Sequence, residues 1–206
     1  KLLYAPDAPE RQAIQILNPL GEDFSIMRTV SVNGLLVSLG NNYNHRNKSV
    51  KLYELGNVYL PKRLPLTELP DERKQLTLCM YDAGDFFTIK GTIENFMERV
   101  GMKKKAVYDP KAGIPYLHPG RQAKIIYDGV EIGFLGELHP QAAKNYEIGT
   151  RAYVAVLDMP SIVPMCSFDY KYKGVAKFPA VSRDLSMVVP KEIMVGDIEK
   201  MIETRD

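Results

Sequence analysis

The stretch AKIIYDGVEIGFLGELH, residues 123–139, decides which kind of sheet this sequence can form. It consists of two runs rich in isoleucine, valine, tyrosine and phenylalanine, separated by the dipeptide Asp128-Gly129. An Asp-Gly pair between two such runs is typical of a type I′ turn, whose twist matches that of an antiparallel hairpin. We therefore predict an antiparallel hairpin here, within a sheet that is also antiparallel.

Further strands are predicted on both sides of this hairpin. The runs 51–60 and 75–82 flank a charged segment, 61–74, with three prolines, so they should form a hairpin with a long exposed loop. Gly56 interrupts the first run, which indicates a bulge or a close backbone approach. We also predict a strand that begins at Gln12 and ends at a turn over 18–21, and another strand over 151–159.

The helices are indicated by apolar residues at helical spacing. One helical face would carry Val32, Leu35, Leu36, Leu39 and Tyr43, with Ser31 as a cap at its start. A second helix is predicted over 85–101, where Gly101 ends it, and a short one over 140–145. Hairpins that alternate with helices favour an α+β fold, with helices packed on an antiparallel sheet, over a doubly wound parallel sheet.

The bulk composition excludes several classes of protein. Of the 206 residues 45% are hydrophobic and 25% are charged, and the formal net charge of +2 creates no global field that demands a nucleic acid or a membrane. No apolar run approaches the roughly 20 residues that span a bilayer. Two widely separated cysteines indicate a reducing compartment, the cytoplasm. Because the chain begins at Lys1 and ends within the charged run EKMIETRD, we expect it to be part of a longer protein.

His118 and His139 are the residues that most resemble a catalytic or metal-binding pair. Each stands at a predicted strand end and precedes a proline, which favours an extended backbone. Three interpretations are open: a catalytic or metal pair, a recognition role, and an architectural role in which a ring nitrogen bonds a loop carbonyl. The architectural role is favoured, because the sequence contains no GxGxxG, GxxxxGK[ST], GxSxG or HExxH motif and no zinc-ligand spacing.

Two glutamates, Glu54 and Glu137, lie inside otherwise apolar predicted strands, where a lone charge would be costly to bury. Each therefore needs a partner, and Arg28 and Arg121 are the candidates. Arg121 could instead hold a carboxylate or phosphate ligand bidentately. Buried ion pairs fix a sheet or an interface more often than they catalyse a reaction.

Four segments carry a resemblance to a known family: NPLGEDFSIMRTVSVNGLL followed by SLGNNYNHRN, LYELGNVYLP, LHPGRQA with GFLGELHP, and KFPAVSRDLSMVV. In the same order, and over essentially the whole chain, they resemble the beta-subunit family of bacterial phenylalanyl-tRNA synthetases. The resemblance implies a class II synthetase-like domain over 1–165 and a linker over 166–176. The start of an anticodon-binding domain with a ferredoxin-like fold would follow over 177–206.

The family joins phenylalanine to its tRNA with ATP and magnesium, as two alpha and two beta chains, and the alpha subunit carries the active site. The resemblance therefore implies a noncatalytic structural and subunit-docking module, with no catalytic residue, metal or cofactor of its own. Leu52-Tyr53-Glu54 stands where a class II site has Arg-x-Glu, and GFLGELHP lacks the late arginine that grips ATP. The structural remnant of such a site would comprise Glu54, His118, Arg121, Glu137 and His139.

The resemblance also implies two surfaces. Class II domains place an early strand and helix at the dimer interface, so the alpha subunit would contact Arg28, Val32, Leu35, Leu36, Leu39 and Tyr43. Alternatively, this stripe is only core of its own domain. Lys177 and Arg183 would contact tRNA weakly, since they fall in the anticodon-binding part. Two other functions stay open: a free-standing tRNA- or RNA-binding module, and a domain that retains residual amino-acid activation.

Overall fold

The computed structural model describes residues 3–169, 172, 174–175 and 177–204, and the chain divides into two compact units, Lys1–Tyr170 and Lys171–Asp206. The division falls inside the segment 166–176 that the sequence predicts as a linker. The first unit contains a single sheet with helices around it. The second contains one described helix, α5, over Val195–Glu203.

The first unit is built on a six-stranded sheet in which every pairing is antiparallel, in the order β1-β2-β6-β5-β4-β3. Its strands are β1 (Val50–Leu60), β2 (Asp71–Tyr81), β3 (Val107–Asp109), β4 (Leu117–Tyr127), β5 (Val130–Leu138) and β6 (Ala152–Asp158). Its α-helices are α1 (Val32–Asn44), α2 (Phe86–Arg99), α3 (Pro140–Asn145) and α4 (Met159–Ile162). Single 3₁₀ turns occur at Pro9–Arg11, Glu22–Phe24 and Val163–Met165. The predicted α+β class and its antiparallel sheet are confirmed.

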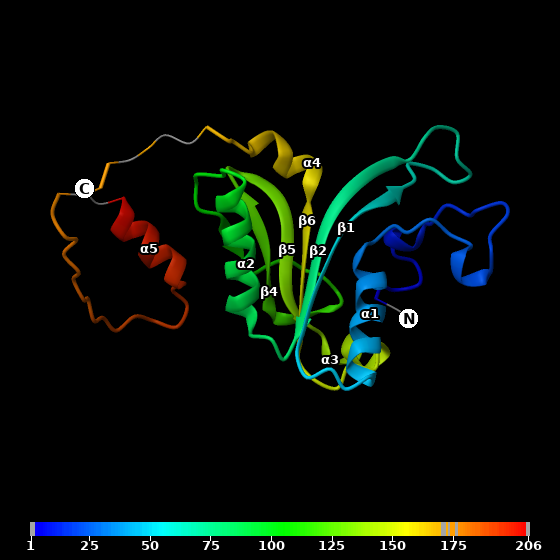
Figure 1. The fold of residues 1–206 in the computed structure, drawn as a ribbon, viewed down its shortest axis with the longest axis horizontal. Coiled ribbons are helices and arrows are strands. Elements are labelled where there is room, and N and C mark those ends of the chain that lie inside the picture. Colours follow the sequence, from blue (N-terminus) through cyan, green and yellow to red (C-terminus); the bar gives the residue numbers. More distant parts are fainter. Residues whose placement is uncertain (1–2, 170–171, 173, 176, 205–206) are drawn as a thin grey trace. The chain divides into compact units, whose positions relative to one another are not determined.

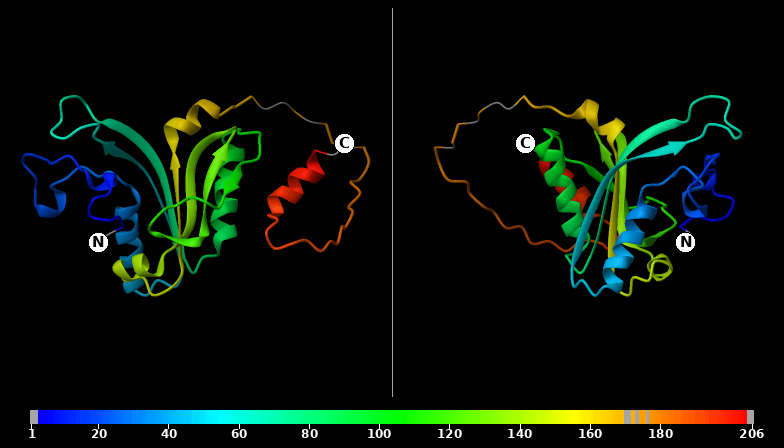
Figure 2. Two further views of the ribbon diagram at one scale, coloured as in Figure 1. Left: turned by 180° about the vertical axis from the view of Figure 1, so that it is seen from behind. Right: turned by 45° about the vertical axis from the view of Figure 1, so that its right-hand side comes forward.

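Helices cover both faces of the sheet, α1 on one side and α2 on the other (Figures 1 and 2). The side chains of the central strand β6 alternate between two cores. Val154 and Val156 pack with the helices α1 and α3, whereas Tyr153, Ala155 and Leu157 pack with α2 and α4. A strand that is buried on both faces reads as a continuous apolar run, which is why AYVAVL contains no polar alternation.

The two predicted hairpins are confirmed. Asp128 and Gly129 have φ values of 52° and 80°, and they form the two-residue turn that type I′ geometry requires between β4 and β5. β1 and β2 pair along their whole length across the loop 61–70. Gly56 lies opposite Gln75 in an unbroken register, so the bulge that was one explanation for this glycine is absent.

The strand predicted from Gln12 is wrong. Only an isolated bridge, Gln15 to Ile26, forms there, with hydrogen bonds from Ile16 N to Ser25 O and from Met27 N to Ile14 O. Pro19 supplies no amide hydrogen to extend this ladder, and the chain turns into the 3₁₀ segment Glu22–Phe24. The short edge strand β3 and the one-turn helix α4 were not predicted, because neither is long enough to show a period.

Ser31 stands at the predicted start of α1, but its hydroxyl does not cap the helix. It donates to Gln75 Oε1 over 2.7 Å and lies 2.5 Å from Thr77 Oγ1, so it links α1 to β2 instead. The helix α2 does have a side-chain cap: Asp85 and Thr88 form a reciprocal capping box. The short helix over 140–145 is confirmed.

In the second unit, residues 177–194 contain no strand. A single extended segment needs neighbouring strands for its hydrogen bonds, and the described part of this unit offers none. The assignment of 177–206 to a ferredoxin-like domain stays a prediction. In the described part of the chain, no helix is long and apolar enough to cross a membrane.

Leu36 tests the core beneath α1, since its side chain is fully buried while its neighbour Val37 is 40% exposed. We expect Leu36→Ala to lower the free energy of unfolding by about 2–5 kcal/mol, because it leaves a cavity between α1 and the sheet. The matched variant Val37→Ala should change it by less than about 0.5 kcal/mol. Urea unfolding followed by circular dichroism measures both; equal losses would contradict this packing.

Candidate functional site

The first charged pair lies on the sheet face that α1 covers. Glu54 is opposite Thr77 in the register, and Thr77 is opposite Val156, which belongs to the core beneath α1. Arg28 Nη1 lies 2.5 Å from Glu54 Oε1, and Arg28 Nε donates to the carbonyl of Asn57 over 2.6 Å. This pairing of Arg28 with Glu54 confirms the predicted partner.

Gly56 leaves room for the Arg28–Glu54 pair in its present position. A Cβ at Gly56 would lie 2.1 Å from Arg28 Nη2 and 2.8 Å from Glu54 Oε1. The glycine therefore serves the close approach of a side chain, not of a second backbone. Since both charged side chains are about one-third exposed, at 37% and 33%, the pair fixes the position of residue 28 more than it adds stability.

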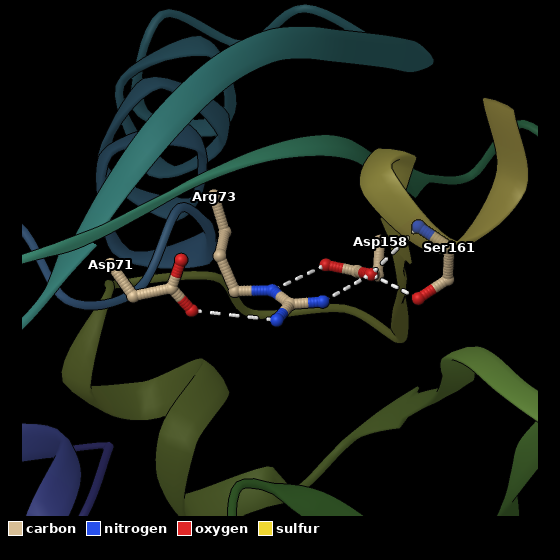
Figure 3. Close-up of polar contacts among 4 residues, drawn as sticks. All are labelled: Asp71, Arg73, Asp158 and Ser161. Atoms are coloured by element: carbon tan, nitrogen blue, oxygen red, sulfur yellow. Dashed lines mark hydrogen bonds and ion pairs between the residues drawn. The ribbon is translucent and has the colours of Figure 1, made fainter.

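A second charged group lies on the same face, at the end of β6 (Figure 3). Arg73 Nε and Nη2 donate to the two carboxylate oxygens of Asp158 over 2.9 and 2.6 Å. Asp158 in turn accepts hydrogen bonds from the backbone amide and the hydroxyl of Ser161, which places it as the cap of α4. Asp71 is a second, more distant partner of Arg73, since its Oδ2 lies 3.4 Å from Arg73 Nη1.

The environment of Asp158 favours its charged form. Burial by itself would raise the pKa of this carboxyl, but the hydrogen bonds from Arg73 and Ser161 and the charge of Arg73 outweigh it, so its pKa lies below the ordinary value. A hollow of about 230 Å³ opens beside this group, with Gln75 and Phe134 also in its wall. The guanidinium is already engaged by Asp158, so it is not available to grip a phosphate there.

The sequence analysis did not find the Arg73–Asp158–Ser161 group. The Asp-x-x-Ser spacing before Ile162 is a cap signature that could have predicted α4. The link from Arg73 to Asp158, by contrast, spans 85 positions in the chain, and no local pattern indicates it.

Glu137, the other predicted buried acid, lies on the opposite face of the sheet. It pairs with Tyr153 in the register, and Tyr153 belongs to the core beneath α2. Glu137 is only 5% exposed, and its Oε1 lies 2.8 Å from Arg121 Nη1 and 3.9 Å from Arg151 Nε. The predicted partner Arg121 is confirmed, and Arg151 is an additional cation that was not predicted.

The two histidines lie at the open end of the β4–β5 hairpin, next to the pair formed by Leu117 and Leu138. Neither ring bonds a carbonyl as predicted. Instead, His118 Nδ1 accepts from the amide of Gly120 and His139 Nδ1 accepts from the amide of Gln141, both over 3.1 Å. An accepting Nδ1 must be unprotonated. These bonds hold a bulge in β4 and the start of α3, so both histidines shape the backbone.

The bulge explains the motif HPGR. Between the pairs Leu117–Leu138 and Gln122–Gly136, four residues of β4 oppose one residue of β5. The extra backbone lies close above Gly136, where a Cβ would be 2.8 Å from the carbonyl oxygen of Arg121. Gly136 is therefore required by the bulge.

The residues predicted as one remnant site do not form one. Glu54 faces α1, Glu137 faces α2, and His118 and His139 lie at the edge where β4 begins and β5 ends. Among residues 3–169, 172, 174–175 and 177–204, no group of three or more His, Cys, Asp or Glu could hold a metal ion. Burial raises the pKa of the Cys79 thiol to about 12, so it is not a thiolate nucleophile at neutral pH.

Aromatic side chains cover part of the α1-side face. The ring of Tyr116 contacts Tyr4 edge-on at 5.4 Å between centroids, and it contacts Phe134 at 6.3 Å. Burial raises the pKa of Tyr4 to about 12. The N-terminal segment of the first unit therefore packs onto the sheet where β4 and β5 lie.

The apolar stripe of α1 is core of its own unit, not an exposed interface. Val32, Leu35, Leu36 and Leu39 are between 0% and 6% exposed, and Tyr43 packs edge-on against Tyr81. These side chains cannot touch another chain while they are buried here. The opposite face of the helix is exposed and comprises Asn33, Gly34, Val37, Ser38 and Asn41. No charged residue occurs anywhere in α1.

A second exposed surface lies beside the isolated bridge. A hollow of about 630 Å³ there is bounded by the segment 14–18, Met27, Tyr59 and the loop side chains Leu66 and Leu69. Leu17, Leu20 and Phe24 in the same segment are 96%, 100% and 68% exposed. Such a concentration of exposed apolar side chains marks an interaction surface.

Lys177 and Arg183, predicted to contact tRNA, lie in the second unit and are exposed. No strand or helix holds them, since the only described helix of that unit begins at Val195. The helix α5 carries exposed apolar side chains, among them Met201 at 65% and Ile202 at 57%.

The fold of the first unit, a six-stranded antiparallel sheet with helices on both faces, is that of a class II aminoacyl-tRNA synthetase domain. A crystal structure of pyrrolysyl-tRNA synthetase from Desulfitobacterium hafniense superposes with a TM-score of 0.60 at 13% identity, and covers 78% of this chain and 55% of that one. A second structure of this synthetase gives a TM-score of 0.56 at 12% identity, over 71% and 51% of the two chains.

Residues 1–159 match the family model described as the phenylalanyl tRNA synthetase beta chain CLM domain. The chain belongs to this family. It is 41% identical over 203 residues to the phenylalanine–tRNA ligase beta subunit of Clostridium acetobutylicum, which aligns with 98% of this chain and 25% of that protein. The Clostridium tetani subunit is 37% identical over 205 residues, 100% of this chain and 26% of that protein. The chain thus spans about a quarter of the length of these relatives.

The group at Asp158 predicts a dependence of stability on pH. Because the folded-state pKa of Asp158 is lowered, its contribution is present above the unfolded value of about 3.9 and is lost as the pH falls through the folded pKa. We expect Asp158→Asn to lower the free energy of unfolding by about 1–2 kcal/mol at pH 7, and by much less at acidic pH.

Asp71→Asn is the matched control, since Asp71 contacts the same guanidinium only at 3.4 Å and its side chain is 49% exposed. It should cost less than about 0.5 kcal/mol at either pH. Chemical unfolding at pH 7 and at acidic pH measures the change in the free energy of unfolding for each of the two variants. A loss at Asp158 that does not change with pH would contradict the assigned charge.

Proposed function

We propose that this chain is a noncatalytic structural and subunit-docking module of a phenylalanine–tRNA ligase. The parent enzyme would be a cytoplasmic assembly of two alpha and two beta chains that uses ATP and magnesium to attach phenylalanine to its tRNA. The alpha subunit would carry the reaction, and this domain would support it. The family of the chain motivates the proposal, and the outer face of α1 is the observation that carries it.

A solvent-facing helix of a globular protein normally presents charged side chains to water. The outer face of α1 presents only Asn33, Gly34, Val37, Ser38 and Asn41. Small and uncharged side chains allow another helix to approach closely, without the cost of removing a charge from water. This face, and not the buried stripe, is our proposed contact with the alpha subunit. The exposed apolar segment that contains Leu17, Leu20 and Phe24 would extend it.

We propose that this chain does not catalyse the reaction because its sheet arginines are already paired with carboxylates. Arg28, Arg73 and Arg121 each hold a carboxylate of this chain. Transfer of an adenylyl group needs fixed cations that are free to stabilise phosphate charge. Arginines that are paired in this way brace the sheet, and the face near Phe134 is filled by Tyr116 and Tyr4. Contacts of Lys177 and Arg183 with tRNA remain part of the proposal for the second unit.

The first test concerns docking. Gly34 on α1 has nothing within 4 Å of a built Cβ, so Gly34→Leu fits the free chain but blocks close approach of another helix. We expect it to keep the unfolding midpoint and to weaken assembly with the alpha subunit at least tenfold, measured by analytical ultracentrifugation. Gly91→Leu on α2 is the matched control, because Gly91 is equally open, and it should assemble normally. Unchanged assembly of the Gly34 variant would contradict the proposed docking surface.

The second test concerns catalysis. We expect this chain alone to support no phenylalanine-dependent exchange of pyrophosphate into ATP, whereas the assembled alpha and beta chains support it. The physical reason is that its sheet arginines are already bound to carboxylates. Turnover by the isolated chain well above a buffer blank would show a retained amino-acid activation site and overturn the proposal.

A further inference from the structure

The dipeptide His-Pro occurs twice in this chain, and both copies make the same hydrogen bond. Nδ1 of His118 accepts from the backbone amide of Gly120 over 3.1 Å. Nδ1 of His139 accepts from the backbone amide of Gln141, also over 3.1 Å. Proline has no N–H, so the amide that follows it is the first one that can turn back to the imidazole ring. We call these two hydrogen bonds the histidine caps.

The third histidine of the chain bonds in the opposite sense. His45 Nδ1 lies 2.7 Å from the carbonyl oxygen of Asn41, and a carbonyl oxygen only accepts, so this ring donates. A donating ring keeps its hydrogen bond when its other nitrogen takes up a proton. An accepting Nδ1 loses its bond, because the added proton occupies the lone pair and faces the N–H of the donor. The histidine caps therefore exist only while the two rings are neutral.

In the described part of the chain, neither ring forms an ion pair with a carboxylate that could stabilise a positive charge on it. The acids nearby have other partners: Glu137 is held by two arginines, and Glu147 accepts from Asn44. The charged side chains on the elements around the two rings are Arg121 on β4, Glu137 on β5, Lys144 on α3, Glu147 after α3 and Arg151 before β6, and α1 has none. Both rings are half-buried, so protons from solvent can reach them.

The cap of His139 holds the start of α3, and α3 in turn braces α1. His139 is the N-cap residue of α3. Tyr146, directly after α3, donates its hydroxyl to Asn33 Oδ1 near the start of α1. At the other end of α1, Asn44 Nδ2 donates to a carboxylate oxygen just after α3 over 2.7 Å. The contact is close, since a Cβ at Gly40 of α1 would lie 2.2 Å from the carbonyl oxygen of Tyr146. Figure 1 shows α3 beside the lower end of α1.

We propose that the histidine caps form an acid-sensitive clasp: protonation of His118 and His139 releases the bulge of β4 and the start of α3, and thereby loosens the brace on α1. Imidazole is the side chain whose charge ordinarily changes between about pH 5 and 8. The stability that the caps contribute is present at the upper end of this range and is lost as the pH falls. On the proposed function, the clasp also controls assembly, because Asn33 lies on the face of α1 that would contact the alpha subunit.

Nuclear magnetic resonance of the whole chain tests the caps directly, because an amide proton shifts upfield when it loses its hydrogen bond. Between about pH 7.5 and about pH 5.5, we expect the amide protons of Gly120 and Gln141 to shift upfield together with the titration of the rings of His118 and His139. Rings that ionise while both amide protons keep their shifts would overturn the proposal. This measurement needs no substitution.

Asparagine is the informative replacement, because its side-chain oxygen accepts from the amide two residues on and does not titrate. On acidification from about pH 7.5 to about pH 5.5, the unfolding equilibrium constant of the wild-type chain should rise about three- to tenfold for each cap. The double variant His118→Asn, His139→Asn should show no such rise. The loss predicted at Asp158 does not interfere, since carboxylates protonate at lower pH.

His45→Asn is the matched control, since the ring of His45 donates its hydrogen bond and can be charged without losing it. This variant should respond to pH as the wild-type chain does. Urea unfolding of the three chains at both pH values measures the equilibrium constants. Equal responses of the wild-type chain and the double variant would contradict the clasp, and so would a response that only His45→Asn removes.

Assembly with the alpha subunit separates this inference from the proposed function. The dissociation constant should rise on acidification by a factor about threefold or more larger for the wild-type chain than for the double variant. Titration of the alpha subunit itself cancels in this comparison. If the wild-type chains do not assemble at about pH 7.5, the proposed function fails, and the amide shifts still decide the clasp. If they assemble and both chains give equal factors, the clasp does not reach α1 and this inference is overturned.

Discussion

Charge pairing on the sheet is the constraint on which the rest of the first unit depends. Glu54, Asp158 and Glu137 can lie on the faces of a covered sheet only because an arginine reaches each of them. Two of the pairs lie beside a local backbone feature: Gly56 lies next to the Arg28–Glu54 pair, and the bulge of β4 that includes Arg121 lies next to Gly136. Each of these arginines is engaged by a carboxylate of its own chain.

The same constraint connects fold and role. The first unit has the fold of a class II aminoacyl-tRNA synthetase domain. Two of its arginines hold local structure in place. Arg28 fixes the segment before α1, and Arg73 fixes the cap of α4 through Asp158. The exposed surface of the first unit includes the uncharged face of α1 and an apolar segment before it. On the proposed function, these surfaces serve binding partners.

Much of the fold could be predicted, and the misses have physical causes. The Asp128-Gly129 turn, the helical spacing of Ile89 and Ile93, and the two acid–arginine pairings depend on local chemistry or on the cost of a lone buried charge. The strand from Gln12 failed because apolar residues can be extended without having a sheet to join. The apolar stripe of α1 is buried within its own unit, and periodicity alone identifies a buried face but not what buries it.

The same contrast between local sequence information and tertiary structure applies to the candidate site. The sequence by itself determined the antiparallel sheet, the family and the partners of Glu54 and Glu137, because turn chemistry, motif order and charge balance are local or compositional. Only the tertiary structure decided that these acids lie on opposite faces, that α1 turns its uncharged side outward, and that Arg73 holds Asp158. Those facts depend on register: a shift of one residue sends a side chain to the other face of the sheet, and no pattern within one strand fixes its pairing with another.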